Sequence, residues 1–172
     1  MAVTHEQVET AQGTREIPLT RGKVALVDDD VYEWASRHNW FLVGKGYAAR
    51  FVRRGRGKRD TLYLHLLVLP PAPGTVTDHR NGNRLDCRRS NLRRVTVSQN
   101  GQNVRRPDPR SVSGVRNVSW SPRRQRYYVR LTVAGLTMRF GGYASLEEAT
   151  TMAAEARRQH MTHAPECGGV VR

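Results

Sequence analysis

The segment from Asp78 to Asn100 constrains the fold of this chain more than any other. The apolar-polar run GTVTDH predicts a strand with Asp78 and His79 at its tip, where adjacent side chains point to opposite sides. A turn signal, N-G-N at 81–83, comes next, and SNLRRVT is the expected returning strand. A helix over SQNGQNVRR, capped by Ser98, would then bring Asn100 back against Asp78. The segment therefore predicts a strand–turn–strand–helix unit that gathers polar side chains.

These polar side chains suit the hydrolysis of a phosphodiester bond. That reaction needs an activated water, a cation on the scissile phosphate and firm positioning. A neutral histidine takes a proton from water at physiological pH, which makes His79 a candidate general base. The Asp78 carboxylate and asparagine amide oxygens are hard ligands that suit Mg²⁺ or Mn²⁺ rather than zinc. The alternative is that Asp-His before N-G-N forms only a polar turn.

The charge of the chain indicates what it binds. The 29 Lys and Arg outnumber the 15 Asp and Glu, which gives a formal net charge of +14. Seven of the acids lie before residue 34, whereas residues 50–139 hold 21 bases and four acids. Such a surface attracts polyanions, so nucleic acid is the expected partner, with an affinity that falls as salt rises. An anionic membrane is disfavoured because no long basic amphipathic helix is visible.

Length and cysteine usage set further bounds. The 172 residues suffice for one ordinary domain or two small ones, and a hydrophobic share of 38% predicts small cores. Two cysteines cannot form a four-cysteine zinc site or a disulfide framework, so Cys87 is expected to act as a small hydrophobe. The N-terminus does not resemble a signal peptide and no apolar run is long enough for a membrane span. We therefore expect a soluble, intracellular protein.

The N-terminal half is expected to begin with a loose tail over residues 1–16. A strand over 23–27 follows, and then a helix to about Arg37 that Asp28 or Asp29 can cap. The apolar side chains of that helix recur with helical spacing, at Val31, Trp34 and Ala35.

Two further strands are expected over WFLVGKGYAARFVRR and DTLYLHLLVL, joined by the basic turn GRGKR. The second strand contains His65, for which a core role is the main expectation and a functional role the alternative. A Pro/Gly break at 70–74 ends this part of the chain. A Pro/Ser/Gly stretch with its linker at 107–111 is the expected domain boundary.

The C-terminal part predicts three short strands, GVRNVSW, RQRYYVRLTVAG and LTMRFGGY, and a closing helix, ASLEEATTMAAEARRQH. Ser145 and Glu148 form a capping box at the start of that helix. Alternation along YYVRLTV predicts one face toward the helix and one outward. The inward residues are Tyr127, Val129, Leu131 and Val133, and the outward ones are Tyr128, Arg130 and Thr132, joined by Arg139. Residues 161–172 are expected to be frayed.

Four spaced elements resemble the HNH family of ββα-metal nucleases, in the subgroup typical of phage and intron-encoded homing endonucleases. They are D-H at 78–79, N-G-N-R-L-D at 81–86, S-N-L-R at 90–93 and S-Q-N at 98–100, with Asn103 following. The resemblance covers about residues 17–106. It implies that His79 is the general base, that Asp78 and Asn100 hold one Mg²⁺ or Mn²⁺ ion, and that Asn91 supports the His79 loop.

This chain departs from the family pattern at two places. Asp86-Cys87-Arg88 stands where members usually carry Asn-Asn-Arg, and His65-Leu66 stands where they usually carry His-Arg. Asn103 is expected to be an exposed helix residue, a DNA contact or a substitute ligand. The basic hairpin region and the returning strand supply expected phosphate contacts, with a solvated hairpin tip as the alternative: Arg50, Arg53, Arg54, Arg56, Lys58, Arg59 and Arg93.

A second resemblance covers about residues 112–160. The matching residues are Gly114-Val115, Trp120, Tyr127, the run Phe140-Gly141-Gly142-Tyr143 and Glu147-Glu148-Ala149, and they resemble the AP2 DNA-binding domain. Members of that family bind DNA through the sheet, whereas the alternative for this chain is a solvated arginine-rich face. The resemblance implies DNA contacts at Arg116, Trp120, Arg123, Arg130 and Arg139.

Together these observations predict an α+β protein: a ββα-metal nuclease domain over 17–106, followed by a three-stranded antiparallel sheet with a helix over 112–160. We expect a metal-dependent endonuclease that cuts double-stranded DNA as a monomer, without a membrane partner or small-molecule cofactor, in the cytoplasm of a bacterial or phage-infected cell. One alternative is an inactive DNA-binding transcriptional regulator on the same domains. Another is a structural RNA-binding protein, which the scarcity of an aromatic platform disfavours.

Overall fold

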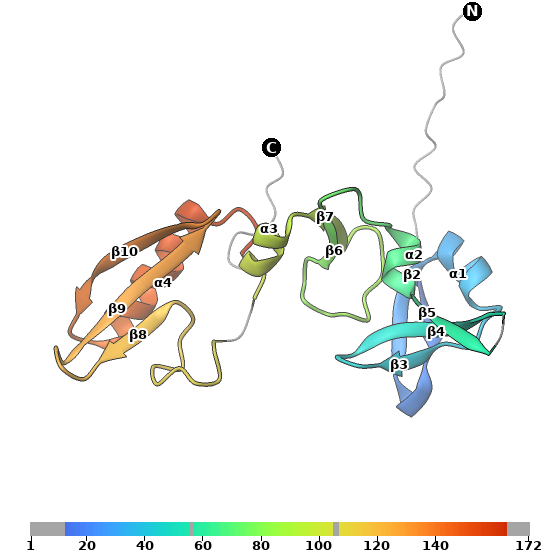
Figure 1. The fold of residues 1–172 in the computed structure, drawn as a ribbon, viewed down its shortest axis with the longest axis horizontal. Helices are drawn as coiled ribbons and strands as arrows, with labels where there is room; N and C mark the ends of the chain where they lie inside the picture. The colour runs from blue at the N-terminus through green and yellow to red at the C-terminus, as the bar shows by residue number, and fades with distance from the viewer. Residues whose placement is uncertain (1–12, 56, 105–106, 165–172) are drawn as a thin grey trace, which may run out of the picture. The chain divides into compact units, whose positions relative to one another are not determined.

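The fold belongs to the α+β class, as the sequence predicts. The computed structural model describes residues 13–55, 57–104 and 107–164, and Figure 1 shows their small antiparallel sheets and short helices. The chain divides into two compact units, Met1–Pro71 with Asn83–Arg93, and Ala72–Gly82 with Arg94–Arg172. The linker expected at 107–111 does not separate these units, because the chain passes from one to the other at three earlier points.

The first unit begins with a two-stranded sheet. β1 (Thr14–Pro18) pairs antiparallel with β2 (Val24–Asp28), and the 3-10 turn η1 (Thr20–Gly22) joins them. Ile17 pairs with Ala25, and both are buried. The loose tail expected over 1–16 is therefore wrong at residues 14–16, because this strand buries Ile17. Residues 1–12 lie outside the described residues.

The helix α1 (Asp29–Ala35) follows β2 directly and ends before the expected Arg37. Val31 and Ala35 are buried, and the indole Nε1 of Trp40 donates to Ala35 O at 2.8 Å beyond the helix end. Their burial adds to the core of this unit, which also collects side chains from both sheets and from the 83–93 segment. Its buried members are Ile17, Leu19, Ala25, Val27, Val31, Ala35, Trp40, Ala48, Leu64 and Cys87.

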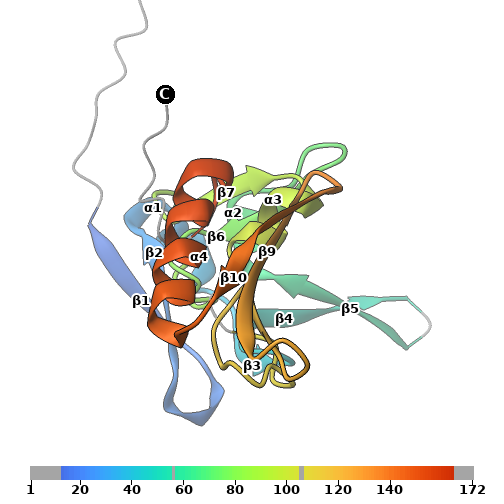
Figure 2. The same ribbon diagram turned by 90° about the vertical axis from the view of Figure 1, so that its left-hand side faces the viewer.

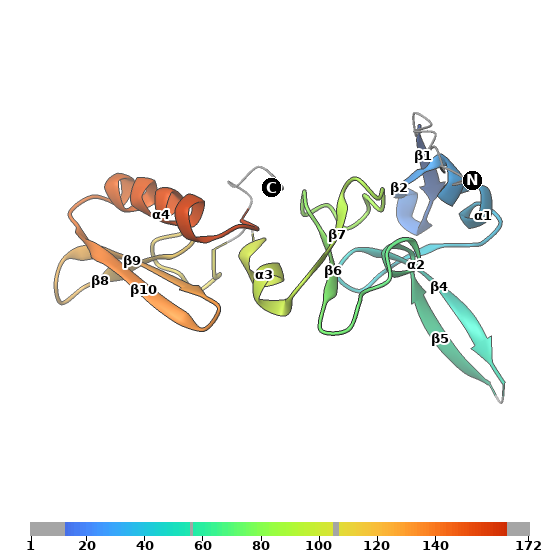
Figure 3. The same cartoon turned by 90° about the horizontal axis from the view of Figure 1, so that it is seen from above.

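A three-stranded antiparallel sheet completes the first unit. Its strands lie in the order β3 (Phe41–Val43), β4 (Tyr47–Arg54) and β5 (Lys58–Tyr63). The β4 and β5 strands extend beyond the other elements of this unit (Figures 2 and 3). The first expected strand is two strands, β3 and β4, because a turn at 44–46 folds them into a hairpin, and the second expected strand ends at Tyr63. The hairpin residue Arg56 lies outside the described residues.

The apolar run after β5 is a helix, α2 (Leu64–Val68), where the sequence predicted a continued strand. Leu64 is buried and Val68 packs against the same core. Residues four apart lie on one face of a helix, so a helical turn directs both side chains into the core. A strand would also place them on one face, and a short apolar run does not distinguish the two.

A second two-stranded sheet pairs β6 (Val76–His79) with β7 (Leu92–Val95), and the division between the units falls within β7. The helix α3 (Val97–Gln102) follows in the second unit. Its cap is Thr96 rather than the expected Ser98. The Thr96 hydroxyl accepts from Gln99 N at 3.2 Å, and Gln99 Oε1 accepts from Thr96 N at 2.9 Å. This reciprocal capping box starts the helix two residues earlier than the sequence suggested.

The C-terminal module consists of β8 (Val118–Ser121), β9 (Arg126–Val133), β10 (Leu136–Tyr143) and α4 (Leu146–His160). The strands lie in the order β10-β9-β8, and α4 runs along one side of the sheet (Figure 3). This matches the predicted strands and helix, and Ser145 caps α4 by accepting from Glu148 N at 3.1 Å.

The module is held by a small core of its own. The small-residue stripe of α4 is buried, at Ala149, Ala153 and Ala156, against Val129 and Leu131 of the sheet. The core also includes Met161 and Ala164, so the frayed segment expected over 161–172 is wrong at these two residues. Residues 165–172 lie outside the described residues. Among the residues that are described, no helix has the length and apolar character to cross a bilayer.

Candidate active site

Asp78 and His79 end β6, as the sequence predicts, and both are nearly buried, at 8% and 5% exposure. A tight turn follows, in which Gly82 N donates to His79 O at 2.9 Å. Gly82 has a φ of 71°, a left-handed conformation that glycine adopts without strain. The glycine of N-G-N therefore lets the chain reverse immediately after the Asp-His pair.

Asn103 holds both residues of this pair. Its amide Nδ2 lies 3.2 and 3.1 Å from the two carboxylate oxygens of Asp78, and it donates to His79 O at 2.8 Å. Asn103 is the C-cap of α3, so this helix meets the end of β6 through one side chain. The sequence predicted only an accessory role for Asn103, but the structure brings it, rather than Asn100, into contact with Asp78.

Asn100 lies three residues earlier on α3 and is exposed. Its backbone takes part in the helix, with Asn100 N donating to Thr96 O at 2.9 Å. Its side chain makes no hydrogen bond within the described residues, and the structure does not bring it onto Asp78. Its predicted role as a metal ligand stays a prediction.

The donor atoms here fit a hard divalent cation better than zinc. No group of three or more His, Cys, Asp or Glu able to hold a metal occurs within the described ranges. The local oxygens are the Asp78 carboxylate and the Asn103 amide oxygen Oδ1, which is buried without a hydrogen-bond partner among the described residues. Carboxylate and amide oxygens, completed by water and phosphate, are the ligands that Mg²⁺ and Mn²⁺ favour.

Asn91 supports a loop in the first unit. Its Nδ2 donates to Asp86 O at 2.7 Å, and the residue is buried. The same loop is joined to β2, because Leu26 N donates to Leu85 O and Cys87 N donates to Leu26 O, each at 2.8 Å. Asn91 therefore fixes the 83–93 loop, and the support of the His79 loop that the resemblance implies for it stays a prediction.

The unusual Asp86-Cys87-Arg88 triplet has a structural explanation. Asp86 is only 1% exposed, and Arg88 binds its carboxylate through Nε at 2.8 Å and Nη2 at 2.7 Å. Cys87 is buried in the core, and burial, together with the neighbouring Asp86 charge, raises the pKa of its thiol to about 12. The expectation that Cys87 acts as a small hydrophobe is confirmed, since a protonated buried thiol is unreactive.

The acidic cluster after β2 binds the same loop. Asp28 accepts from Arg89 N at 2.9 Å, and Asp30 forms two bonds of 2.7 Å with the Arg89 guanidinium. The Arg89 hydrogen bond lowers the pKa of Asp30. The sequence predicted Asp28 or Asp29 as a helix cap, but Asp28 caps α1 without a side-chain cap bond. This contact spans about 60 residues and has no local sequence signal.

His65 is buried among aromatic rings. Its ring stacks on Tyr47 with centroids 5.0 Å apart and lies 5.9 Å from the Tyr63 ring. These contacts favour the packing role over the functional alternative. Its location on α2 is a correction, because the sequence placed it in a strand.

The β4–β5 hairpin carries predicted phosphate contacts in opposed like-charge pairs. Arg53 pairs directly with Arg59, and Arg54 with Lys58. Opposed like charges cost about 0.2–1 kcal/mol unless an anion screens them. Arg54 is partly compensated by Asp60 at 2.9 Å. The hairpin therefore offers a concentrated positive charge near an exposed aromatic ring, Phe51.

Two other predicted phosphate contacts are less exposed. Arg50 is half-buried, and its guanidinium lies 5.7 Å from the ring centroid of Trp40. Arg93 is half-buried on β7. Both arginines are therefore less exposed than the described basic residues of the hairpin, Arg53, Arg54, Lys58 and Arg59.

The outer face of the C-terminal sheet is basic, as the alternation of β9 predicts. Tyr128, Arg130 and Thr132 alternate with the inward residues, and Arg139 lies directly opposite Arg130. Two further arginines, which were not among the predicted contacts, belong here: Arg126 of this face and Arg124, which donates to the Tyr128 hydroxyl at 3.4 Å. Period-two alternation from Tyr128 back to Arg126 was the available signal. Residues 112–144 contain no Asp or Glu, so no local acid neutralises this face.

The remaining predicted contacts of the module lie elsewhere. Trp120 pairs with Tyr127, whose ring packs against the core, so Trp120 shares the helix-facing side rather than the outer face. Arg123 is exposed in the β8–β9 turn. Arg116 is half-buried, and its Nη2 donates to Gln102 O at 2.9 Å, which is an internal contact instead of the expected exposed one.

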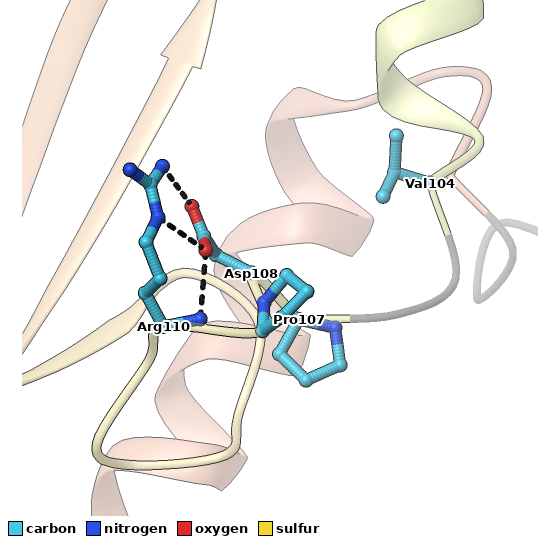
Figure 4. Close-up of a pocket in the computed structure, with 5 residues that line it drawn as sticks. Val104, Pro107, Asp108 and Arg110 are labelled. Carbon is cyan, nitrogen blue, oxygen red and sulfur yellow. Dashed lines mark hydrogen bonds and ion pairs between the residues drawn. The ribbon is translucent and has the colours of Figure 1, made fainter.

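A shallow pocket near the start of the module contains none of the predicted catalytic residues. It is lined by Val104, Pro107, Asp108, Pro109 and Arg110, and Figure 4 shows the Arg110 guanidinium turned onto Asp108. The Arg110 hydrogen bonds lower the pKa of Asp108, and Asp108 raises the pKa of Arg110. The two charged side chains of this pocket are thus paired with each other.

A comparison with known protein families matches one segment of the chain. Residues 66–102 match the family model described as HNH endonuclease. This span includes β6, β7 and α3, with Asp78, His79, Asn91 and Asn100. No curated protein and no solved structure matches the chain. The chain thus contains a segment similar to HNH endonucleases, which indicates a nuclease that acts on DNA.

Proposed function

We propose that this protein is a divalent-metal-dependent endonuclease of the homing type that hydrolyses phosphodiester bonds in double-stranded DNA. The observation that carries the proposal is the meeting of Asp78, His79 and Asn103 at the end of β6, inside or beside the segment that matches HNH endonucleases. A buried carboxylate and a buried histidine at the end of a strand, just before a tight turn, suit the hydrolysis of a phosphodiester bond. A polar turn without chemical function would not need to bury them.

His79 is the proposed general base, which takes a proton from the attacking water at an imidazole nitrogen. Its neighbour Asp78, together with Asn100, is the proposed oxygen-donor set for one Mg²⁺ or Mn²⁺ ion. When bound, this ion would stabilise negative charge on the scissile phosphate and the leaving 3′ oxygen. Asn91, which keeps the 83–93 loop in place, is the proposed support of the His79 loop.

The basic surfaces are proposed to hold the duplex. The β4–β5 hairpin and the outer face of the C-terminal sheet both concentrate arginines, and family resemblance to AP2 domains suggests that the sheet reads DNA. A small active site contacts few base pairs, so a second DNA-binding surface adds affinity and site preference. We propose a monomer, because the chain carries one candidate site.

An inactive DNA-binding regulator is the second candidate function. One observation favours it: the Asn103 Nδ2 lies within 3.2 Å of both Asp78 oxygens, the atoms that a cation needs. Such a protein would keep salt-sensitive DNA binding without cleavage.

Cleavage of supercoiled plasmid decides between these functions. Wild type, His79→Ala and the matched control His38→Ala, an exposed histidine, would be incubated with Mg²⁺, Mn²⁺ or EDTA. We expect wild type and His38→Ala to nick or linearise the DNA with metal only, and His79→Ala to lose at least about 100-fold in rate. Equal cutting by His79→Ala would contradict its role as base. DNA binding by all three without cutting would favour the regulator.

A further inference from the structure

The second unit contains a continuous set of contacts from the C-terminal module to the Asp-His pair. At one end, Asn103 holds Asp78 and His79. Directly before it, Gln102 is buried, and its backbone and side chain both bind the module. These contacts lie within one compact unit. The placement of Asn103 against Asp78 and His79 therefore depends on the contacts that hold α3.

Arg116 is the main connector. Its Nη2 donates to Gln102 O at 2.9 Å and lies 3.7 Å from Met161 Sδ. The Arg116 backbone is itself held, because Arg157 Nη1 donates to Arg116 O at 3.1 Å. Arg157 and Met161 are buried at the end of α4. The guanidinium thus ties the last turn of α3 to the base of the module.

A second link runs through the Gln102 side chain. His163 N donates to Gln102 Oε1 at 3.1 Å, just beyond the buried Met161. An isolated helix of six residues, the length of α3, is too short to be stable in water. Tertiary contacts must therefore hold it, and those of Gln102 come from the module on both its backbone and its side chain.

From this geometry we propose that Asn103 is a positioning residue for Asp78 and His79, and that Arg116 and Gln102 make its placement depend on the C-terminal module. Arg116 then acts as a connector instead of a DNA contact. The module is both a DNA-binding surface and a support of the active site. This inference rests on the proposed nuclease function only for its effect on cleavage, because the contacts themselves are testable without it.

Full-length variants separate the two parts of the proposal. Arg116→Ala removes the link, and we expect faster amide hydrogen exchange in α3, at Asn100 and Asn103, by about tenfold or more. Asn103→Ala keeps the link, and we expect faster exchange at Gly82, whose amide donates to the His79 carbonyl. Arg158→Ala is the matched control, because Arg158 is an exposed α4 arginine paired with Glu155.

Cleavage kinetics supply the second measurement. We expect Asn103→Ala and Arg116→Ala to lower kcat by about 10- to 100-fold with little change in KM, since a small displacement of reacting groups has that effect. Arg158→Ala should leave kcat and exchange at wild-type values. Arg130→Ala should raise KM while α3 exchange stays unchanged.

The outcomes remain distinguishable. If wild type cuts no DNA, the nuclease proposal fails. The exchange rates still show whether the placement of Asn103 depends on the C-terminal module. If folded Arg116→Ala leaves α3 exchange unchanged, or Asn103→Ala leaves Gly82 exchange and kcat unchanged, the inference is overturned. Should Arg116→Ala not fold, Arg116→Met, which keeps an aliphatic side chain but removes the guanidinium donors, is expected to increase α3 exchange, and no increase would overturn the link.

Discussion

Two groups of arginines in this protein contrast sharply. In the 83–93 loop, Arg88 and Arg89 are bound to Asp86, Asp28 and Asp30 by short hydrogen bonds. On the outer face of the C-terminal sheet, arginines face each other across strands in a stretch without any acid. The first group holds the fold together, whereas the second leaves its charge for a partner.

This contrast shows why a count of arginines overstates a DNA-binding surface. The 29 Lys and Arg include arginines whose charge is already paired with an acid inside the protein. An opposed pair such as Arg130 and Arg139 destabilises the isolated sheet slightly, and a bound polyanion removes that cost. Variants that remove charged side chains from each group in turn are therefore the most direct test of this contrast.

The largest effect is expected from Asp86→Ala in the paired group. The Asp86 side chain is 2% exposed and its partner Arg88 is 32% exposed. Loss of one member of a fully buried pair costs about 3–5 kcal/mol, and because Arg88 can turn toward water we expect about 2–3 kcal/mol here. Urea unfolding measures this loss, and DNA affinity should stay at the wild-type value. An unchanged midpoint would show that the loop does not depend on this pair.

Cys87 labelling gives a local readout of the same change. In a Cys167→Ser background, the buried Cys87 thiol, with its pKa raised to about 12, should resist alkylation at about pH 8 until the loop opens. Asp86→Ala should speed labelling. Arg110→Ala, which breaks only an exposed pair with Asp108, should change neither labelling nor the unfolding midpoint.

A smaller effect, on binding instead of stability, is expected from Arg130→Ala with Arg139→Ala. If this face binds duplex DNA, the slope of log affinity against log salt should fall by up to about two, because each phosphate that the protein no longer neutralises removes about 0.9 from it. Stability should stay the same or rise by about a few tenths of a kcal/mol as the opposed charges disappear. Fluorescence anisotropy across a salt series measures the slope.

The matched control removes the same net charge from paired arginines. Arg110 and Arg158 are exposed and bind Asp108 and Glu155. The double variant Arg110→Ala with Arg158→Ala should leave the salt slope nearly unchanged. Equal slopes for both double variants would mean that only net charge matters, and that the sheet face has no special role.

Sequence reasoning succeeded where the signal is local. Alternation along β9 predicted which side of the sheet carries Tyr128 and Arg130, because side chains of a strand alternate strictly. The place of the Asp-His pair at the end of β6 followed from the run GTVTDH and from the turn signal N-G-N at 81–83. These elements depend on neighbours a few residues away.

Prediction failed where distant contacts decide. Asp28 and Asp30 bind Arg89 about 60 residues away, which no local pattern reveals. Asn103, instead of Asn100, contacts Asp78 because α3 begins at the Thr96 cap and ends at Gln102. A difference of two residues in the start of a short helix thus changes which side chain meets the site.

The smallest effect concerns the pH dependence of the paired group. Arg89 lowers the pKa of Asp30 below its usual 3.8, so the ionised pair stabilises the folded state above that pH and is lost as pH falls through the lowered pKa. Because both side chains are about half exposed, the contribution should be below about 1 kcal/mol. Asp30→Asn should therefore be slightly less stable than wild type at about pH 7, and the difference should close as pH falls through the lowered pKa of Asp30. A difference in stability that persists at low pH would mean that the packing of the Asp30 side chain, and not its charge, makes the contact with Arg89 favourable. The arginines of the 83–93 loop would then differ from those of the sheet face in packing and not in electrostatics.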